Sequence, residues 1–196
     1  MKYWMIMLAL AGWLFVGCQS GDNNTTADSE GSDTTQTEEP GEKPLLSPPD
    51  STSATLGDLT VQINYGSPSV RERVIWDELV PYGEIWRTGA NEATTFTVNQ
   101  DVMIGEDTLS AGRYALFTIP AEGEWTVILN RDADQWGAYE YNEEEDALRF
   151  MVTPEMTDTA QEKMAFKAEA EEAAVHVHFM WEKLTFTFAV VPLTAS

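Results

Sequence analysis

The segment 86–92 holds the densest group of side chains that could recognise a ligand, and it reads WRTGANE. The indole of Trp86 can stack on a ligand, and Arg87, Asn91 and Glu92 can exchange hydrogen bonds with it. A glycine inside the segment permits an unusual turn. The alternative is a buried Arg87–Glu92 ion pair that holds a crossing loop in place. Both interpretations stay open at this point, with a slight preference for the ion pair.

A second aromatic group follows in a glycine-bearing loop. It consists of Trp136, Tyr139 and Tyr141 around Gly137. Exposed rings in a loop favour ligand binding, whereas buried rings would only hold the loop in place. We therefore add Trp136 and Tyr139 to the candidate ligand-binding residues.

Three side chains that can bind metal ions occur at every second position near the C-terminus. His176, His178 and Met180 alternate with apolar residues, so in a strand they would lie on one face. Imidazole and thioether groups in such a row could hold a soft metal such as copper. The more common explanation is a solvent-facing strand that happens to carry two histidines, and we favour it.

Other catalytic chemistry finds little support in the sequence. Only two histidines are present, and the chain has no Gly-x-Ser-x-Gly elbow, phosphate-binding loop or glycine-rich nucleotide motif. Carboxylate pairs that could hydrolyse glycosides are not informative in so acidic a chain. We expect a non-catalytic protein without a cofactor, and keep a carboxylate-dependent hydrolase as the alternative.

The first residues resemble a bacterial lipoprotein signal. Lys2 precedes an apolar stretch that ends in Gly17-Cys18, the only cysteine of the chain. The stretch is shorter than the roughly 20 residues of a spanning helix. It resembles the bacterial lipobox, although Phe15 replaces the more usual Leu. We expect a signal peptide over residues 1–17 and acylation of Cys18, for example by palmitate, because several acyl chains anchor a protein stably.

The next segment has the composition of an acidic tether. Residues 18–55 are rich in Gly, Ser, Thr, Asp, Glu and Pro and poor in large apolar residues. Such a segment cannot offset its ordering entropy by burial, so we expect it to be disordered. The formal net charge of the whole chain is -22. This charge repels phosphate backbones, so nucleic acid is excluded as a partner.

Residues 56–196 carry the pattern of a β-rich domain. Apolar residues alternate with polar ones in short runs between turn signals, which is typical of strands. We expect strands over 59–65, 94–98, 102–104, 114–119, 125–129, 148–152, 164–168, 175–181 and 184–190, with a tight hairpin at Glu182-Lys183. At most one short helix, over 70–80, is expected. The pattern predicts an all-β fold, an antiparallel β-sandwich that is jelly-roll-like.

Three motifs of this domain resemble a known family. They read LVPYGEIWRTGANEAT from residue 79, LSAGRYALFTIP from residue 109, and EWTVILN with QWGAY from residues 124 and 135. Together they are similar to domain of unknown function 2911, which is common in Bacteroidetes lipoproteins, and the resemblance covers residues 56–192. It supports the fold class and the type of host, but it implies no activity.

These observations combine into one expectation about function. We expect a monomeric lipoprotein held in the cell envelope through acylated Cys18, at the outer membrane on its periplasmic or surface face. Its β-sandwich is expected to bind a glycan or small polar ligand without catalysis. This rests on fold and location. Besides the hydrolase, a purely structural or assembly subunit without ligand remains an alternative.

Overall fold

The structure is a computed structural model that describes residues 46–193. Apart from one 3-10 turn at Glu143–Glu145, its regular elements are strands. In chain order they are β1 (Pro49–Leu56), β2 (Leu59–Gly66), β3 (Thr94–Val98), β4 (Val102–Ile104), β5 (Asp107–Leu109), β6 (Gly112–Ile119), β7 (Trp125–Asn130), β8 (Asp146–Val152), β9 (Glu155–Glu171) and β10 (Ala174–Pro192). Within the described residues, no helix is long and apolar enough to cross a membrane.

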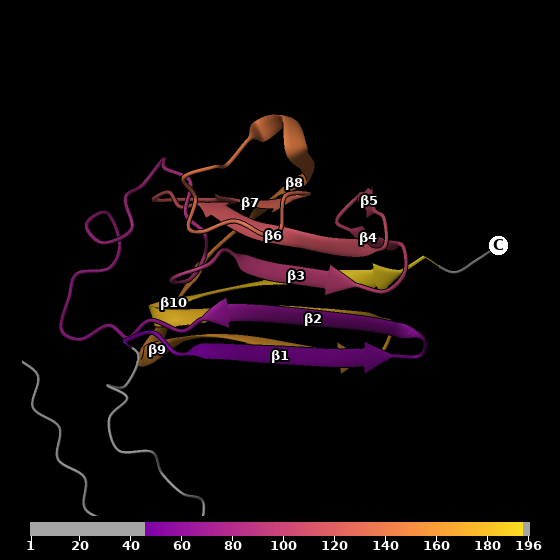
Figure 1. Cartoon of the computed structure of the whole chain (residues 1–196). Coiled ribbons are helices and arrows are strands. Elements are labelled where there is room, and N and C mark those ends of the chain that lie inside the picture. Colours follow the sequence, from indigo (N-terminus) through magenta and orange to yellow (C-terminus); the bar gives the residue numbers. More distant parts are fainter. Residues whose placement is uncertain (1–45, 194–196) are drawn as a thin grey trace, which may run out of the picture. The chain divides into compact units, whose positions relative to one another are not determined.

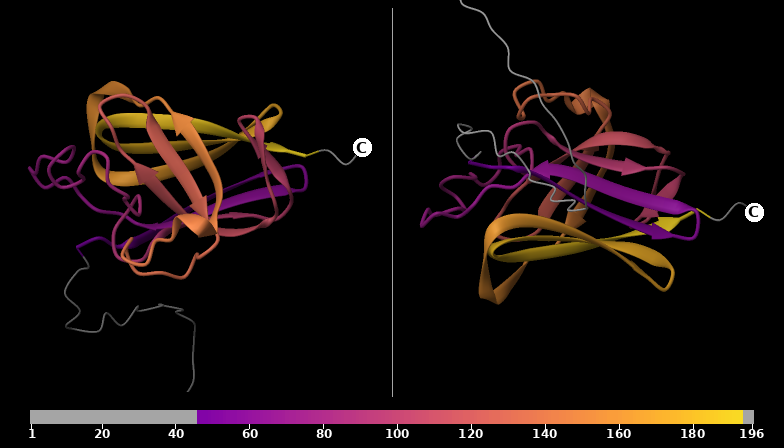
Figure 2. Two further views of the ribbon diagram at one scale, coloured as in Figure 1. Left: turned by 90° about the horizontal axis from the view of Figure 1, so that it is seen from above. Right: turned by 60° about the horizontal axis from the view of Figure 1, so that its bottom comes forward.

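The strands form two antiparallel sheets that pack as a sandwich, which confirms the expected fold class. The larger sheet has the order β1-β2-β3-β6-β7-β8 and the smaller one β5-β4-β10-β9 (Figure 1). Figure 2 shows the indigo strands β1 and β2 and the gold strands β9 and β10 in separate layers. The larger sheet pairs consecutive strands of the chain, except that β3 pairs with β6 across the excursion through β4 and β5.

Residue alternation along the strands fills the space between the sheets. In β2, Leu59, Val61 and Ile63 are fully buried, whereas Gln62 and Asn64 are exposed on the other face. The same alternation places Tyr114 and Leu116 of β6 in the main core. Because successive side chains of a strand point to opposite faces, the polar members of these strands lie on the outer face of the larger sheet.

An aromatic cluster occupies one part of this core. The ring of Trp76 lies edge-on to Trp125, with centroids 5.0 Å apart, and to Trp181 at 5.8 Å. Trp86 stacks on Trp181 at 5.8 Å and meets Phe179 edge-on. Edge-to-face and offset-stacked aromatic pairs add to the stabilisation that burial provides. Four of the tryptophans in the chain therefore serve the core.

The chain folds back on itself within β10. Phe179 and Phe186 stack with ring centroids 4.8 Å apart, and Nδ1 of His178 lies 2.8 Å from Oγ1 of Thr187. Seven residues of extended chain would span more than about 20 Å, so the chain must reverse between these contacts. Glu182 has a positive φ of 56° at this point, and the pairing with β9 shifts register there. The contacts therefore place a chain reversal at Glu182-Lys183, where the sequence predicts a hairpin.

The structure stays within the expectation of at most one short helix. No helix forms over residues 70–80; the segment is a series of turns in which Arg71, Glu72 and Asp77 have positive φ. Ile75 and Val80 are buried in the main core, so their packing overrides the weak helical pattern.

The tether also ends earlier than expected. Residues 49–56 are strand β1, which pairs with β2 along its whole length from Pro49↔Gly66 to Leu56↔Leu59. β1 is an edge strand with mostly exposed residues. Its Ser- and Thr-rich composition therefore resembles a tether, although backbone pairing holds it on the domain.

A second, smaller core lies on the outer face of the larger sheet. Ala115 and Phe117 of β6 and Ile128 of β7 are fully buried there, together with Ala93. Three residues of the connecting loops pack against this smaller core: Ile85, Ala138 and Tyr141. Its two β6 residues, Ala115 and Phe117, face away from the main core. Loop residues thus cover the outer face over β6 and β7 and form one border of the candidate site.

Candidate functional site

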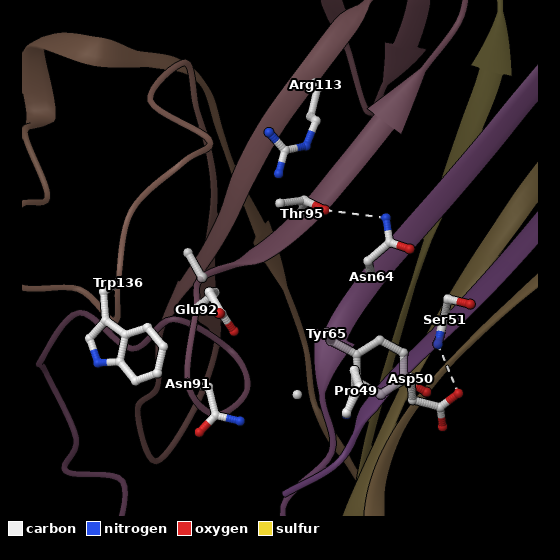
Figure 3. A pocket seen from close by; sticks show the side chains of 12 residues that line it. Pro49, Asp50, Ser51, Asn64, Tyr65, Asn91, Glu92, Thr95, Arg113 and Trp136 are labelled. Atoms are coloured by element: carbon white, nitrogen blue, oxygen red, sulfur yellow. Dashed lines mark hydrogen bonds between the residues drawn. The ribbon is translucent and has the colours of Figure 1, made fainter.

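A groove of about 770 Å³ lies on the outer face of the larger sheet (Figure 3). Small-molecule sites usually have volumes of roughly 300–1,000 Å³. A smaller hollow of about 270 Å³ shares Glu92, Arg113 and Trp136 with it. The groove is lined by Pro49, Asp50, Ser51, Asn64, Tyr65, Gly66, Asn91, Glu92, Ala93, Thr95, Arg113 and Trp136.

Polar side chains of three neighbouring strands form the floor of the groove. Asn64 of β2 and Thr95 of β3 are register partners, and Nδ2 of Asn64 donates a hydrogen bond to Oγ1 of Thr95 over 3.4 Å. Arg113 of β6 pairs with the loop residue Asp134, whose Oδ1 lies 2.6 Å from Nη1. Each of these side chains occupies an outward position of its strand, which explains why polar residues alternate with the core residues.

One wall of the groove is made where two loops meet. Ala93 N–H donates to Gln135 O over 3.0 Å, and Gly137 N–H donates to Asn91 O over 3.1 Å. These bonds bracket the isolated bridge between Glu92 and Trp136. Trp136 is 59% exposed although its backbone is held on both sides. A large apolar ring that is exposed beside a cavity is a candidate contact for a ligand.

The loop that carries Glu92 is held rigidly. Thr88 is fully buried, and its hydroxyl donates to Oγ1 of Thr118 over 3.1 Å. Thr88 and Asn91 both have positive φ, 50° and 66°, a strained backbone for a β-branched residue such as threonine. Nδ2 of Asn91 donates to Ser47 O over 3.0 Å. Such strain persists only where the surroundings fix it, and it is often found at functional sites.

The opposite wall comes from β1. Figure 3 shows Pro49, Asp50 and Ser51 across the groove from Trp136 and Glu92. The carboxylate of Asp50 accepts a hydrogen bond from Ser51 N–H over 2.8 Å and is exposed. Burial raises the pKa of the neighbouring Tyr65, and the negative charge of Asp50 raises it further. Tyr65 is therefore a neutral phenol at physiological pH.

The structure brings together only part of the predicted ligand-binding set. Asn91, Glu92 and Trp136 line the groove, but Trp86, Arg87 and Tyr139 do not. Trp86 packs into the aromatic cluster of the main core. Tyr139 is 85% exposed outside the groove.

The alternative of a buried Arg87–Glu92 ion pair is wrong. Glu92 is exposed, and no ion pair joins it to Arg87 among residues 46–193. The guanidinium of Arg87 lies near Gly137 instead. A Cβ built on Gly137 would be 3.7 Å from Nη1 of Arg87. The Nε of Arg87 is buried without a hydrogen-bond partner. Arg87 thus lies against the loop that carries Trp136 and does not form an ion pair with Glu92.

One of the predicted metal-ligand side chains, His178, already contacts other side chains of the protein. His176 and His178 lie side by side, with ring centroids 6.4 Å apart. Nδ1 of His178 faces the hydroxyl of Thr187, and its Nε2 lies 3.6 Å from a carboxylate oxygen of Glu169. In the described part of the chain, no three His, Cys, Asp or Glu side chains meet in a way that could hold a metal ion.

Nine lining residues escaped the sequence reasoning, among them Asp50, Ser51, Asn64, Thr95 and Arg113. Asp50 and Ser51 lie in the segment assigned to the tether, and Asn64, Thr95 and Arg113 read as ordinary solvent-facing strand residues. The only available signal was the outward position of the last three in adjacent strands. That signal becomes specific only when the strand order is known.

Comparisons with known proteins identify the family. Neither the curated proteins nor the solved structures contain a significant match to the chain. The family model described as protein of unknown function (DUF2911) matches residues 47–190. This range starts before β1 and ends within β10, so it covers both sheets and all the residues that line the groove. The chain therefore belongs to the DUF2911 family of proteins of unknown function.

Proposed function

We propose that this domain is a non-catalytic binding module of an envelope lipoprotein, and that it holds a glycan or another small polar ligand in the groove beside Trp136. One observation carries the proposal: an exposed tryptophan on a rigid loop borders a groove whose lining combines apolar surface with several polar side chains. An aromatic ring gives contact area at low entropic cost, and the surrounding polar groups fix the orientation of the ligand.

The polar groups offer both hydrogen-bond donors and acceptors. Asn64, Ser51 and Thr95 supply amide and hydroxyl groups, and Glu92 supplies carboxylate oxygens. A molecule rich in hydroxyl or amino groups can satisfy such a lining. The scaffold is already formed, because the strands hold the floor and backbone hydrogen bonds fix the Glu92–Trp136 wall.

The surroundings of the carboxylates favour binding over hydrolysis. An acid catalyst at neutral pH is a carboxyl group that burial keeps protonated. Glu92 and Asp50 are both exposed to water, and neither histidine lines the groove. The arrangement therefore offers hydrogen bonds to a ligand but no paired acid and base.

Membrane attachment is part of the same proposal and rests on the sequence. Cys18 follows an apolar segment that opens with Lys2, a pattern typical of an acylated lipoprotein. Cys18 lies outside the described residues. Replacing it by Ser should move the protein from the membrane fraction to the soluble fraction and abolish incorporation of labelled palmitate. A Cys18→Ser protein that stays membrane-bound, together with an unlabelled wild type, would refute the attachment.

Binding is tested by screening neutral oligosaccharides and small polar compounds against the detergent-solubilised full chain. Trp136→Ala should weaken binding of any hit at least about tenfold, because it removes the main apolar contact. Tyr139→Ala is the matched control, since Tyr139 is another exposed aromatic of the same loop but lies outside the groove. Equal loss in both variants, or no binding to the wild type at all, would contradict the proposal and favour a structural subunit.

A further inference from the structure

We infer that two copies of this chain associate through strand β8, which pairs antiparallel with β8 of the second copy about a two-fold axis at Phe150. The two larger sheets then form one continuous sheet across the interface. A dimer departs from the monomer expected from the sequence, because the strand order that leaves β8 at an edge is not evident there. The interface lies away from the groove, so its test is independent of the binding function.

Two of the four sheet edges are covered by other parts of the chain, and a third is short. The edge of β1 faces β9 of the other sheet, and Ala168 N–H donates to Oγ1 of Thr52 over 3.0 Å. The middle of β9 is covered by residues 68–70, which exchange two backbone hydrogen bonds of 2.8 Å with Glu162 and Met164. β5 has only three residues and offers little length for pairing.

The first part of β9 is protected against a second copy in a different way. It carries the carboxylates of Glu155 and Asp158, both exposed. The pairing of β9 with β10 also shifts register twice beyond Met180. Charged side chains and bulges are devices by which proteins prevent the association of sheet edges. Two copies of this part of β9 would bring like charges together.

Strand β8 is open along its outer side in the described part of the chain. It pairs with β7 from Val152 to Asp146, and within residues 46–193 no other backbone–backbone hydrogen bond involves residues 147–152. Nη1 of Arg131 donates to Asp146 O over 2.9 Å and covers the first residue of the strand. The unpaired N–H and C=O groups of such an edge are a template for a further strand.

The two faces of β8 select the register of the pair. Leu148 and Val152 are buried, whereas Arg149 and Met151 are exposed on the outer face. Pairing must match like faces, because a shift by one residue would turn the buried face outward. Opposing Arg149 with its own copy would place like charges together. Opposing it with Met151 of the partner subunit avoids this and lets the thioether pack on the aliphatic part of the arginine. Phe150 then lies on the two-fold axis.

This arrangement leaves the groove and the N-terminal segment accessible. β1 and β8 are the opposite edges of the larger sheet (Figure 1). The groove is lined by residues of β1, β2, β3, β6 and two loops, and β8 contributes none of them. Each copy can therefore bind a ligand while its β8 is paired.

The test is sedimentation velocity of the detergent-solubilised full chain at concentrations up to about 1 mM, a range that detects weak pairs. Physiological salt is needed because two chains of net charge -22 repel each other, and ions screen this repulsion. The wild type should show a monomer–dimer equilibrium. Met151→Lys places a second cation opposite Arg149 at two symmetric positions, so it should raise the dissociation constant at least about fivefold. Met151→Glu places opposite charges there and should lower the constant at least about threefold.

Met156 provides the matched controls, because it is another exposed methionine, 71% exposed, and lies outside β8. Met156→Lys and Met156→Glu make the same changes of net charge and should each alter the constant less than about twofold. All four variants should keep the melting temperature of the wild type, since both methionines are exposed.

Three results would overturn the inference. A wild type that sediments as a monomer at every concentration shows that β8 does not pair. Met151 variants that behave like the Met156 variants show that any dimer uses another surface. If Met151→Lys and Met151→Glu both weaken the dimer, Met151 opposes its own copy, and the axis at Phe150 is wrong.

Discussion

Glu92 and Trp136 are directly opposed in an antiparallel bridge that joins two loops far apart in the sequence. The flanking hydrogen bonds, Ala93 N–H to Gln135 O and Gly137 N–H to Asn91 O, make this a non-hydrogen-bonded pair. In such pairs the two side chains lie on the same face and approach closely. The bridge therefore places a carboxylate and an exposed indole side by side on the rim of the groove, and the proposed binding function depends on it.

The relation between Arg87 and Glu92 gives the first prediction. Since no ion pair joins them and Glu92 is exposed, Glu92→Ala should lower the free energy of unfolding by about 1 kcal/mol or less. Arg87→Ala should cost more, because Arg87 is half-buried against the Trp136 loop. A double-mutant cycle in urea should give coupling below about 0.5 kcal/mol. Coupling above about 1.5 kcal/mol would show that the two charges interact directly after all.

Gly66 should tolerate no side chain. A Cβ at this position would lie 2.1 Å from the carbonyl oxygen of Ala90, in the loop that leads to Glu92. The atoms that this Cβ would meet all belong to the backbone of Ala90, so Gly66→Ala should cost about 3 kcal/mol or more and lower the melting temperature by roughly 6–12 °C. Gly123→Ala is the control, because open space surrounds that position and its φ is not positive. Equal stability of the two variants would mean that the close approach of β2 and the loop is not as described.

The boundary of the domain gives a third prediction. A chain that starts at Glu42 keeps β1 and the hydrogen bonds of Ser47 and Pro48 to Asn91 and Ser67. It should melt within error of the full chain. A chain that starts at Gly57 lacks β1 and leaves the edge of β2 unpaired, so it should lose at least about 3 kcal/mol of stability at roughly 1 kcal/mol per hydrogen bond. If both truncated chains melt together, β1 is not part of the cooperative unit.

How much of the fold can be predicted from the sequence differs from strand to strand. β3 and β4 have the expected bounds because each is a short run of apolar and β-branched residues between clear turn signals. β1 was missed because an edge strand with few buried side chains has no such alternation. β9 is much longer than the expected strand 164–168, since its first nine residues are all exposed and are held by backbone pairing instead.

The candidate site, too, could be predicted only in part from the sequence. Trp136, Asn91 and Glu92 stand out in the sequence because unusual residue types gather in glycine-bearing loops. Trp86 belongs to the same motif but packs in the core, and residue type alone does not distinguish an exposed indole from a buried one. Asn64, Thr95 and Arg113 become one floor only through the strand order β2-β3-β6. Such long-range pairing is not encoded in any local pattern.

The loop that carries Trp136 should respond to alkaline pH through Tyr141. Burial and a hydrogen bond to Asp146 raise the pKa of Tyr141 from 10.0 to about 12. The unfolded chain loses this proton near pH 10, so the stability that the neutral phenol contributes is complete below pH 10 and is lost as the pH rises through 12. In urea unfolding between pH 10 and 12, Tyr141→Phe should therefore lose stability less steeply than the wild type. The control Tyr139→Phe, at an exposed position, should follow the wild type, and identical slopes for all three proteins would show that Tyr141 does not ionise differently in the two states.

The most direct test of the binding function is a ¹H–¹⁵N NMR spectrum of the full chain in detergent, recorded with and without a saturating amount of the tightest-binding compound. The indole N–H signal of Trp136 and the backbone amides of Glu92 and Ala93 should shift, because these residues line the groove. The indole signals of the buried Trp125 and Trp181 should stay in place, and the compound should be recovered chemically unchanged. Shifts that leave Trp136 unmoved and gather elsewhere on the domain, or conversion of the compound, would contradict a non-catalytic binding site in this groove.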